Sequence, residues 1–280
     1  MNKRIIMAIV QKDIKTTFSS KKVWIPMILL PVILCVILPA VFAFIGIHTG
    51  LVSGNTNDLE EPINDFLRSF PNGDMRNTLA SLPTLGYKSV YFFLNFMMIP
   101  FFLMVAIINS MVTASNSFAG EKERNTLETL LFAPITVKEL FMGKVLASFF
   151  PSLLISFASF LINAIVVNVI TYPYFKEILF FNSTWLLLMF WVIPALVIFN
   201  IILNVLVSAR VKSFQEAQQF GGLMVLPAVG LIISQVSGLF FLSPLLLVLI
   251  GAGLLIANVL LLKAITKFNQ RNALFESQIH

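Results

Sequence analysis

The residues best suited to chemistry form one charged segment between two long apolar runs. It reads Gly120-Glu-Lys-Glu-Arg-Asn-Thr-Leu-Glu-Thr-Leu-Leu-Phe-Ala-Pro134, and Gly143-Lys144 follows shortly after it. Its carboxylates accept charge-assisted hydrogen bonds, which are roughly twice as strong as neutral ones. A polar helix between two membrane spans also offers a contact surface through which a soluble partner could exert force on both spans. The segment therefore favours mechanical coupling, in a transport subunit that is driven from outside the lipid.

The periodicity of this segment predicts an amphipathic helix over residues 121–133. Three leucines share one face at i, i+3 and i+4 spacing: Leu127, Leu130 and Leu131. Arg124 and Glu128 have the i, i+4 spacing of a helical ion pair. Pro134 ends the helix because proline has no backbone N–H to donate. An ordinary solvated loop helix is the alternative that composition alone leaves open.

Other chemistry finds little support in the sequence. The pattern G-x-x-x-x-G-K-[ST] does not occur, and Gly143-Lys144 lacks the remaining P-loop residues, so any ATP hydrolysis would have to come from another polypeptide. No His, Cys and acid cluster has the spacing of a metal site, and we assign no catalytic or metal-binding residue. The basic residues follow the membrane boundaries and form no continuous patch, which argues against nucleic acid as a partner.

The composition is that of an integral membrane protein. Hydrophobic residues make up 58% of the chain and charged residues 11%, against about 25% charged in soluble domains. We therefore expect a single all-α transmembrane domain over residues 1–280. Six segments approach the roughly 20 apolar residues of a span: 24–47, 89–118, 145–169, 184–208, 220–236 and 242–262. The fifth is the shortest, and Gly221-Gly222 and Pro227 are expected to break it or make it partly re-entrant.

The basic residues predict the orientation of these spans, because cytoplasmic loops carry an excess of Lys and Arg. With the N-terminus inside, fifteen basic residues are cytoplasmic: Lys3, Arg4, Lys12, Lys15, Lys21, Lys22, Lys122, Arg124, Lys138, Lys144, Arg210, Lys212, Lys263, Lys267 and Arg271. Four lie outside: Arg68, Arg76, Lys88 and Lys176. We expect a multi-pass protein of the cell membrane with both termini in the cytoplasm, an extracellular loop at 48–87 and a cytoplasmic segment at 119–144.

The N-terminal residues 1–22 form a different kind of element. Apolar residues recur every four positions at Ile6, Val10, Ile14 and Phe18, with lysines between them. This pattern predicts an amphipathic helix that lies in the inner headgroup layer. A helical extension of the first span is the alternative.

The spans carry no acidic or basic residue, but eight asparagines: Asn95, Asn109, Asn116, Asn163, Asn168, Asn200, Asn204 and Asn258. Amides in lipid must find partners, so they face other helices or a wet cavity. We select Asn109, Asn116, Asn200 and Asn204 as candidate lining of a translocation path. Hydrogen bonding between helices is the alternative. Without a buried carboxylate, a proton relay has no obvious carrier.

The charged segment resembles the cytoplasmic signature of ABC-2 type transporter permeases, the membrane subunits of one class of ATP-binding-cassette exporters. The resemblance rests on about 25 residues: Gly120-Glu121-Lys122-Glu123, Thr126-Leu127-Glu128, Leu130-Leu131, Pro134, Glu139-Leu140 and Gly143-Lys144. It implies a coupling helix that docks on an ATPase, with these residues involved: Glu121, Glu123, Arg124, Leu127, Glu128, Leu130 and Leu131. It also implies two ATPase subunits that bind ATP and Mg, a second permease subunit, and no cofactor on this chain.

The resemblance leaves several points open. Relatives often have a pair of re-entrant helices between spans five and six, for which residues 221–262 leave little room. A neutral interior rich in Phe and Asn favours a hydrophobic or amphipathic molecule or a peptide as substrate. Sodium export and a non-transporting immunity or sensor role are the alternatives. A membrane-embedded enzyme would need carboxylate or His clusters at membrane depth, which the spans lack.

Overall fold

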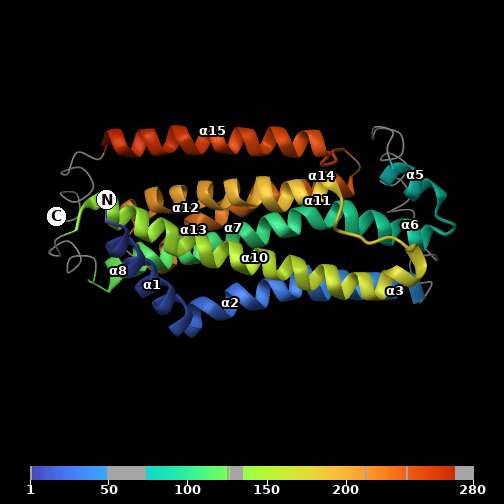
Figure 1. Ribbon diagram of the computed structural model, residues 1–280, viewed down its shortest axis with the longest axis horizontal. Coiled ribbons are helices and arrows are strands. Elements are labelled where there is room, and N and C mark those ends of the chain that lie inside the picture. The colour runs from blue at the N-terminus through green and yellow to red at the C-terminus, as the bar shows by residue number, and fades with distance from the viewer. Residues whose placement is uncertain are drawn as a thin grey trace.

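The computed structural model describes residues 2–48, 74–124, 126, 135–211, 213–237 and 239–268. In these residues all regular structure is helical, and the long helices run side by side in one bundle (Figure 1). Six helical stretches are long and apolar enough to cross a membrane. The prediction of an all-α membrane protein with six spans is confirmed.

Each span except the third and the sixth is built from several consecutive helical pieces. Span one comprises α2 (Lys21–Pro31), the π-helical η1 (Val32–Ile37) and α3 (Leu38–His48). Span two comprises α6 (Leu85–Phe92), the π-helical η2 (Phe93–Met97), α7 (Met98–Ser117) and α8 (Ala119–Glu123). Span three is α10 (Val137–Phe175), and span four comprises α11 (Ser183–Leu187), the π-helical η3 (Leu188–Val192) and α12 (Ile193–Arg210). Span five comprises α13 (Phe214–Gly222), the 3-10 turn η4 (Leu223–Val225) and α14 (Leu226–Val236), and span six is α15 (Pro244–Phe268).

Spans two and three are much longer than a bilayer requires. Each covers 38 residues, or about 57 Å at the helical rise, whereas the hydrocarbon core is about 30 Å thick. Both therefore project beyond the lipid. We call the end of the bundle that holds α8 and the N-terminal helix α1 (Lys3–Ser19) the inner end. Helices α5 (Asp74–Ser81) and α6 lie at the opposite end (Figure 1).

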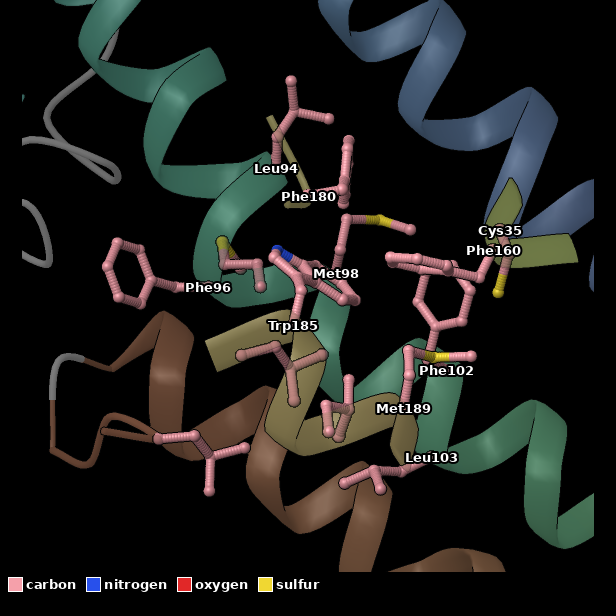
Figure 2. Packing of buried hydrophobic residues seen from close by; sticks show 14 of the residues in the cluster. Cys35, Leu94, Phe96, Met98, Phe102, Leu103, Phe160, Phe180, Trp185 and Met189 are labelled. Atoms are coloured by element: carbon pink, nitrogen blue, oxygen red, sulfur yellow. The ribbon is translucent and has the colours of Figure 1, made fainter. Parts of the chain in front are cut away.

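The core of the bundle surrounds span two. In its most apolar window 78% of the residues are buried, compared with 17% in spans five and six. Figure 2 shows the aromatic centre of this core, where the Phe102 ring lies 5.3 Å from that of Trp185 and 5.9 Å from that of Phe160. Phe92, Phe96 and Phe102 of span two are all fully buried. These rings pack between helices.

Span five changes its helical geometry at the residues that the sequence singled out, but it is not broken. Gly221-Gly222 ends α13, the 3-10 turn η4 follows, and Pro227 stands in the first turn of α14. The helix nevertheless continues over Phe214–Val236. Only residues 237–243 separate α14 from α15. This short connection agrees with the expectation that a re-entrant pair has little room here.

The N-terminal helix α1 is separate from span one. The Asn2 side chain caps its start by accepting from the backbone N–H of Arg4 at 3.0 Å. Ser20 breaks the helix before α2 with extended backbone angles of φ −93° and ψ 108°. The alternative of a continuous extension of span one is therefore wrong. Helix α1 packs on α10 and leaves Met7 and Phe18 exposed. Its placement in the headgroup layer remains a prediction.

Candidate functional site at the inner end

The signature segment begins as a continuation of span two. Helix α8 follows directly on α7 and ends at Glu123. Arg124 then leaves helical geometry, with φ −85° and ψ 3°, and Thr126 is helical again. The helix predicted over residues 121–133 is thus interrupted at Arg124. Residues 125 and 127–134 lie outside the described residues, and with them the predicted positions Leu127, Glu128, Leu130 and Leu131.

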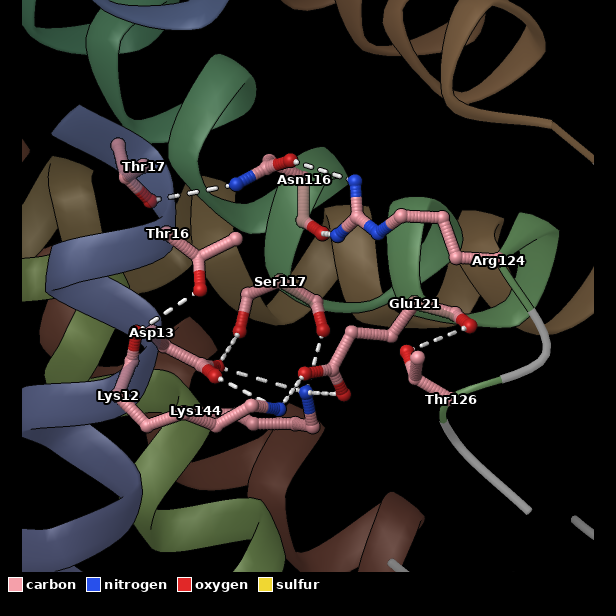
Figure 3. Close-up of polar contacts among 10 residues, drawn as sticks. All are labelled: Lys12, Asp13, Thr16, Thr17, Asn116, Ser117, Glu121, Arg124, Thr126 and Lys144. Atoms are coloured by element: carbon pink, nitrogen blue, oxygen red, sulfur yellow. Dashed lines mark hydrogen bonds and ion pairs between the residues drawn. The ribbon is translucent and has the colours of Figure 1, made fainter. Parts of the chain in front are cut away.

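Four charged side chains from three elements meet beside α8 (Figure 3): Lys12 and Asp13 of α1, Glu121 of α8 and Lys144 of α10. The Lys144 ammonium contacts Oε2 of Glu121 and lies 3.4 Å from Oδ2 of Asp13. The Lys12 ammonium contacts the other Glu121 oxygen and lies 3.5 Å from Oδ1 of Asp13. Ser117 completes the cluster, since its carbonyl accepts from Lys144 and its hydroxyl donates to Asp13.

This charge cluster is buried and balanced. The exposed fractions of Asp13, Glu121 and Lys144 are 4%, 3% and 1%, while Lys12 reaches the surface. A charge in the interior is tolerated only when it is paired and hydrogen-bonded. Two ammonium groups here face two carboxylates, so the formal charges cancel. The cluster therefore holds α1, the end of span two and the start of span three in one arrangement.

The surroundings of Glu121 differ from the sequence prediction. The sequence places Glu121 on a surface that meets an ATPase, but the structure turns its carboxylate inward. The cause is pairing with lysines 109 residues earlier and 23 residues later in the chain, which local periodicity does not reveal. Glu123 is exposed and accepts from the backbone N–H of Phe214 at 2.8 Å. Arg124 is exposed as well, beside the carbonyl oxygen of Asn116 at 3.5 Å.

Gly143 explains how α1 approaches α10 closely enough to form the cluster. A Cβ atom on Gly143 would lie 2.8 Å from Cγ2 and 2.9 Å from Cβ of Ile9. Real Cβ atoms do not come so near to another carbon, so only glycine fits without movement. Gly143 thus leaves room for α1, and Lys144 neutralises the buried carboxylates.

A second contact joins α1 and α10 at their starts. Thr136 caps α10 in a capping box with Glu139. One Glu139 oxygen accepts from the Thr136 backbone N–H at 3.1 Å, and the other accepts from the Asn2 backbone N–H at 2.6 Å. We call α1, α8 and the first turns of α10, with these contacts, the inner junction.

Sequence reasoning missed Lys12 and Asp13, and it quoted Glu139, Gly143 and Lys144 in the family signature without assigning them a role. One signal was available. Asp13 is the only acidic residue among the first 22, and it shares the helical face of Ile6 and Val10. A carboxylate on the apolar face of an amphipathic helix needs a buried cationic partner.

The chain matches the family described as ABC-2 family transporter protein over residues 7–271. This match includes every span and the inner junction from Met7 of α1 onward. The chain belongs to the ABC-2 transporter family. It is thus a multi-pass membrane permease of an ABC transporter, a class that associates with an ABC ATPase. A search among curated proteins found no match.

Three of the four asparagines selected in this ABC-2 permease bind neighbouring helices. The Asn200 amide donates to the Ile107 carbonyl and to the Ser110 hydroxyl, both at 2.7 Å. Asn204 accepts from the Ser115 hydroxyl at 3.3 Å. These bonds join span four to span two. The amide of Asn116 donates to Thr17 of α1 at 3.3 Å. All three side chains are thus engaged in helix–helix contacts, as the alternative interpretation requires.

Asn109 differs from the other three asparagines of the permease. It is 1% exposed, and neither atom of its amide has a hydrogen-bond partner among the described residues. It lies one turn from Thr113, whose hydroxyl contacts Ser148 and Ser152 of α10. Buried amides without partners are rare and call for an explanation, such as water or a passing ligand. Asn109 is therefore the strongest of the four as a pathway residue.

Proposed function

We propose that this permease is the membrane subunit of an ABC exporter of the cell membrane, driven by a separate ATPase at the inner end. In this assembly two permease subunits, identical or related, form the pathway, and two ATPase subunits bind ATP and Mg. Both termini face the cytoplasm. The proposal is supported by the family match and by the predicted excess of basic residues on the inner side.

The observation that carries the proposal is the buried charge cluster. It ties the end of span two to the start of span three, on the two sides of the segment that the family resemblance assigns to ATPase docking. Force applied to residues 124–136 would reach both spans at once, because Glu121 and Lys144 connect them. Glu121 then acts as a positioning residue. The docking surface consists of these residues: Glu123, Leu127, Glu128, Leu130 and Leu131. Arg124 is turned toward Asn116 instead.

The exported substrate is proposed to be a hydrophobic or amphipathic molecule or a peptide. The spans offer neutral groups, with buried aromatic rings and the unpartnered amide of Asn109. Such a path suits a substrate of low charge, because a charged one would lose its hydration without gaining a counter-ion. The permease itself carries out no covalent step in this proposal.

Affinity capture tests this assignment. The tagged chain, extracted from its own membranes in a mild detergent, is expected to retain a P-loop polypeptide in equal molar amount, and the eluate is expected to hydrolyse ATP. An unrelated tagged six-span protein, treated in the same way, serves as the control. A chain that is purified without any ATPase, while its host still exports the substrate, would refute the proposal.

A further inference from the structure

An open groove lies on the surface of the inner junction, between α1 and the end of α8. Its volume is about 580 Å³. Three cationic and three hydroxyl side chains line it: Lys12, Lys15, Arg124, Thr16, Ser19 and Ser20. Cationic groups beside hydroxyl donors are the usual surroundings of a bound phosphate group.

Two of the three cations are available to a ligand. The Lys12 ammonium is already engaged by Glu121 and lies near Asp13. Lys15 and Arg124 are exposed, and no carboxylate of the described residues pairs with either of them. Because no described carboxylate balances the charge of Lys15 or Arg124, the groove has a net positive charge.

The Arg124 side chain is partly fixed in place without a ligand. Its two terminal nitrogens lie 3.5 Å from the side-chain oxygen and from the carbonyl oxygen of Asn116 (Figure 3). Asn116 is in turn fixed by its hydrogen bond to Thr17 of α1. A guanidinium held in this way loses less freedom on binding a phosphate group than a free side chain does.

The groove lies at the depth where lipid headgroups are expected. Ser19 and Ser20 form the bend between α1 and span one, whose first residue is Lys21. Trp24 stands in the first turn of that span, a position typical of aromatic residues at the membrane interface. Exposed apolar side chains flank the bend, with Phe18 before it and Ile25 after it.

We propose that this groove binds the phosphate group of an anionic phospholipid from the leaflet at the inner end. Arg124 offers a planar pair of N–H donors, Lys15 a second positive charge, and the serines hydroxyl donors. The acyl chains would lie along the exposed apolar face of span one. A lipid in this position would join α1 to the residue at which α8 ends, and so would stabilise the inner junction from outside.

Lipid retention tests the site. The full-length chain is placed in nanodiscs that contain equal amounts of phosphatidylglycerol and phosphatidylcholine, and native mass spectrometry then counts the lipids that stay bound. The wild-type chain is expected to keep one phosphatidylglycerol. The Lys15→Gln/Arg124→Gln variant should retain it less by on the order of tenfold or more, since charge-assisted hydrogen bonds are lost.

Two further variants separate a specific site from general attraction. Lys21→Gln/Lys22→Gln removes the same charge from exposed positions at the same end, and it should keep the lipid. Lys15→Arg/Arg124→Lys preserves both charges and should restore most of the retention if the first variant is correctly folded.

Four outcomes would overturn the proposal. Equal retention of the two lipids, or equal loss in the Lys21/Lys22 control, would mean that no headgroup site exists. Displacement of the lipid by millimolar inorganic phosphate would assign the groove to a soluble phosphate compound. If the Lys15→Gln/Arg124→Gln variant lost a co-expressed ATPase but retained the lipid, the groove would be assigned to an acidic protein surface.

Discussion

Replacement of Lys144 by methionine is expected to destabilise the permease by about 3–5 kcal/mol, the cost of breaking a buried ion pair from one side. The variant would leave the carboxylates of Asp13 and Glu121 in the interior with only the ammonium of Lys12 to face them. The Ser117 carbonyl would also lose its donor. We expect the unfolding midpoint of the detergent-solubilised chain to fall by on the order of 10 °C.

Charge balance can be restored without returning the lysine. Adding Asp13→Asn to Lys144→Met leaves one ammonium and one carboxylate, those of Lys12 and Glu121, which are already in contact. The double variant should therefore be more stable than Lys144→Met alone. Lys138→Met, at an exposed lysine on the same helix, is the control and should change stability by less than about 0.5 kcal/mol. Equal stability of Lys144→Met and Lys138→Met would show that the cluster contributes nothing.

Leucine at Gly143 is expected to separate α1 from α10. Its Cβ atom would meet Ile9 at 2.8–2.9 Å, and position 143 is buried. Overpacking of this kind costs about 1–3 kcal/mol. Because Asp13 is carried by α1, the displacement would also weaken its contact with Lys144. Hydrogen exchange should report faster exchange in α1, and ATP-driven export should fall with it.

The neighbouring residue supplies a control for this variant. Met142 is 39% exposed, and Met142→Leu should leave both exchange and export unchanged. A second change, Ile9→Ala, removes the Cγ2 and Cδ1 atoms at 2.8 and 3.3 Å but keeps the Cβ atom at 2.9 Å, and it should restore a small part of the protection in Gly143→Leu. Protection of α1 at the wild-type level in Gly143→Leu alone would mean that α1 does not dock through this contact.

The spans could be predicted from the sequence because lipid imposes a length and a polarity on each of them. The inner ends of spans two and three could not. Judged by hydropathy, span two ends at Phe118 because charged residues follow it. Span three begins at Val145 because charged residues precede it. The structure continues both helices to Glu123 and from Val137. Their charges are accommodated because Lys144 and Glu121 neutralise each other.

The sequence did not predict the contacts of the charge cluster. The motif placed Glu121 and Gly143-Lys144 at one end of two neighbouring spans, and the structure brings them together there. The partners on α1, Lys12 and Asp13, are more than one hundred positions away in sequence, so no local spacing connects them. Among the asparagines, Asn200 and Asn204 lie four residues apart and so share a helical face, but only coordinates show that this face is bonded to span two.

The central claim, that an ATPase drives this permease through residues 124–136, is tested most directly by ATP hydrolysis in the reconstituted complex with a Glu128→Ala permease. We predict unchanged thermal stability and an ATPase bound about 10–100-fold more weakly, the effect of one lost charge-assisted hydrogen bond. Hydrolysis should fall to the rate of the isolated ATPase, while Glu61→Ala, in the predicted extracellular loop, should behave as wild type. Wild-type binding and wild-type coupled hydrolysis in Glu128→Ala would contradict the claim and place the docking surface elsewhere.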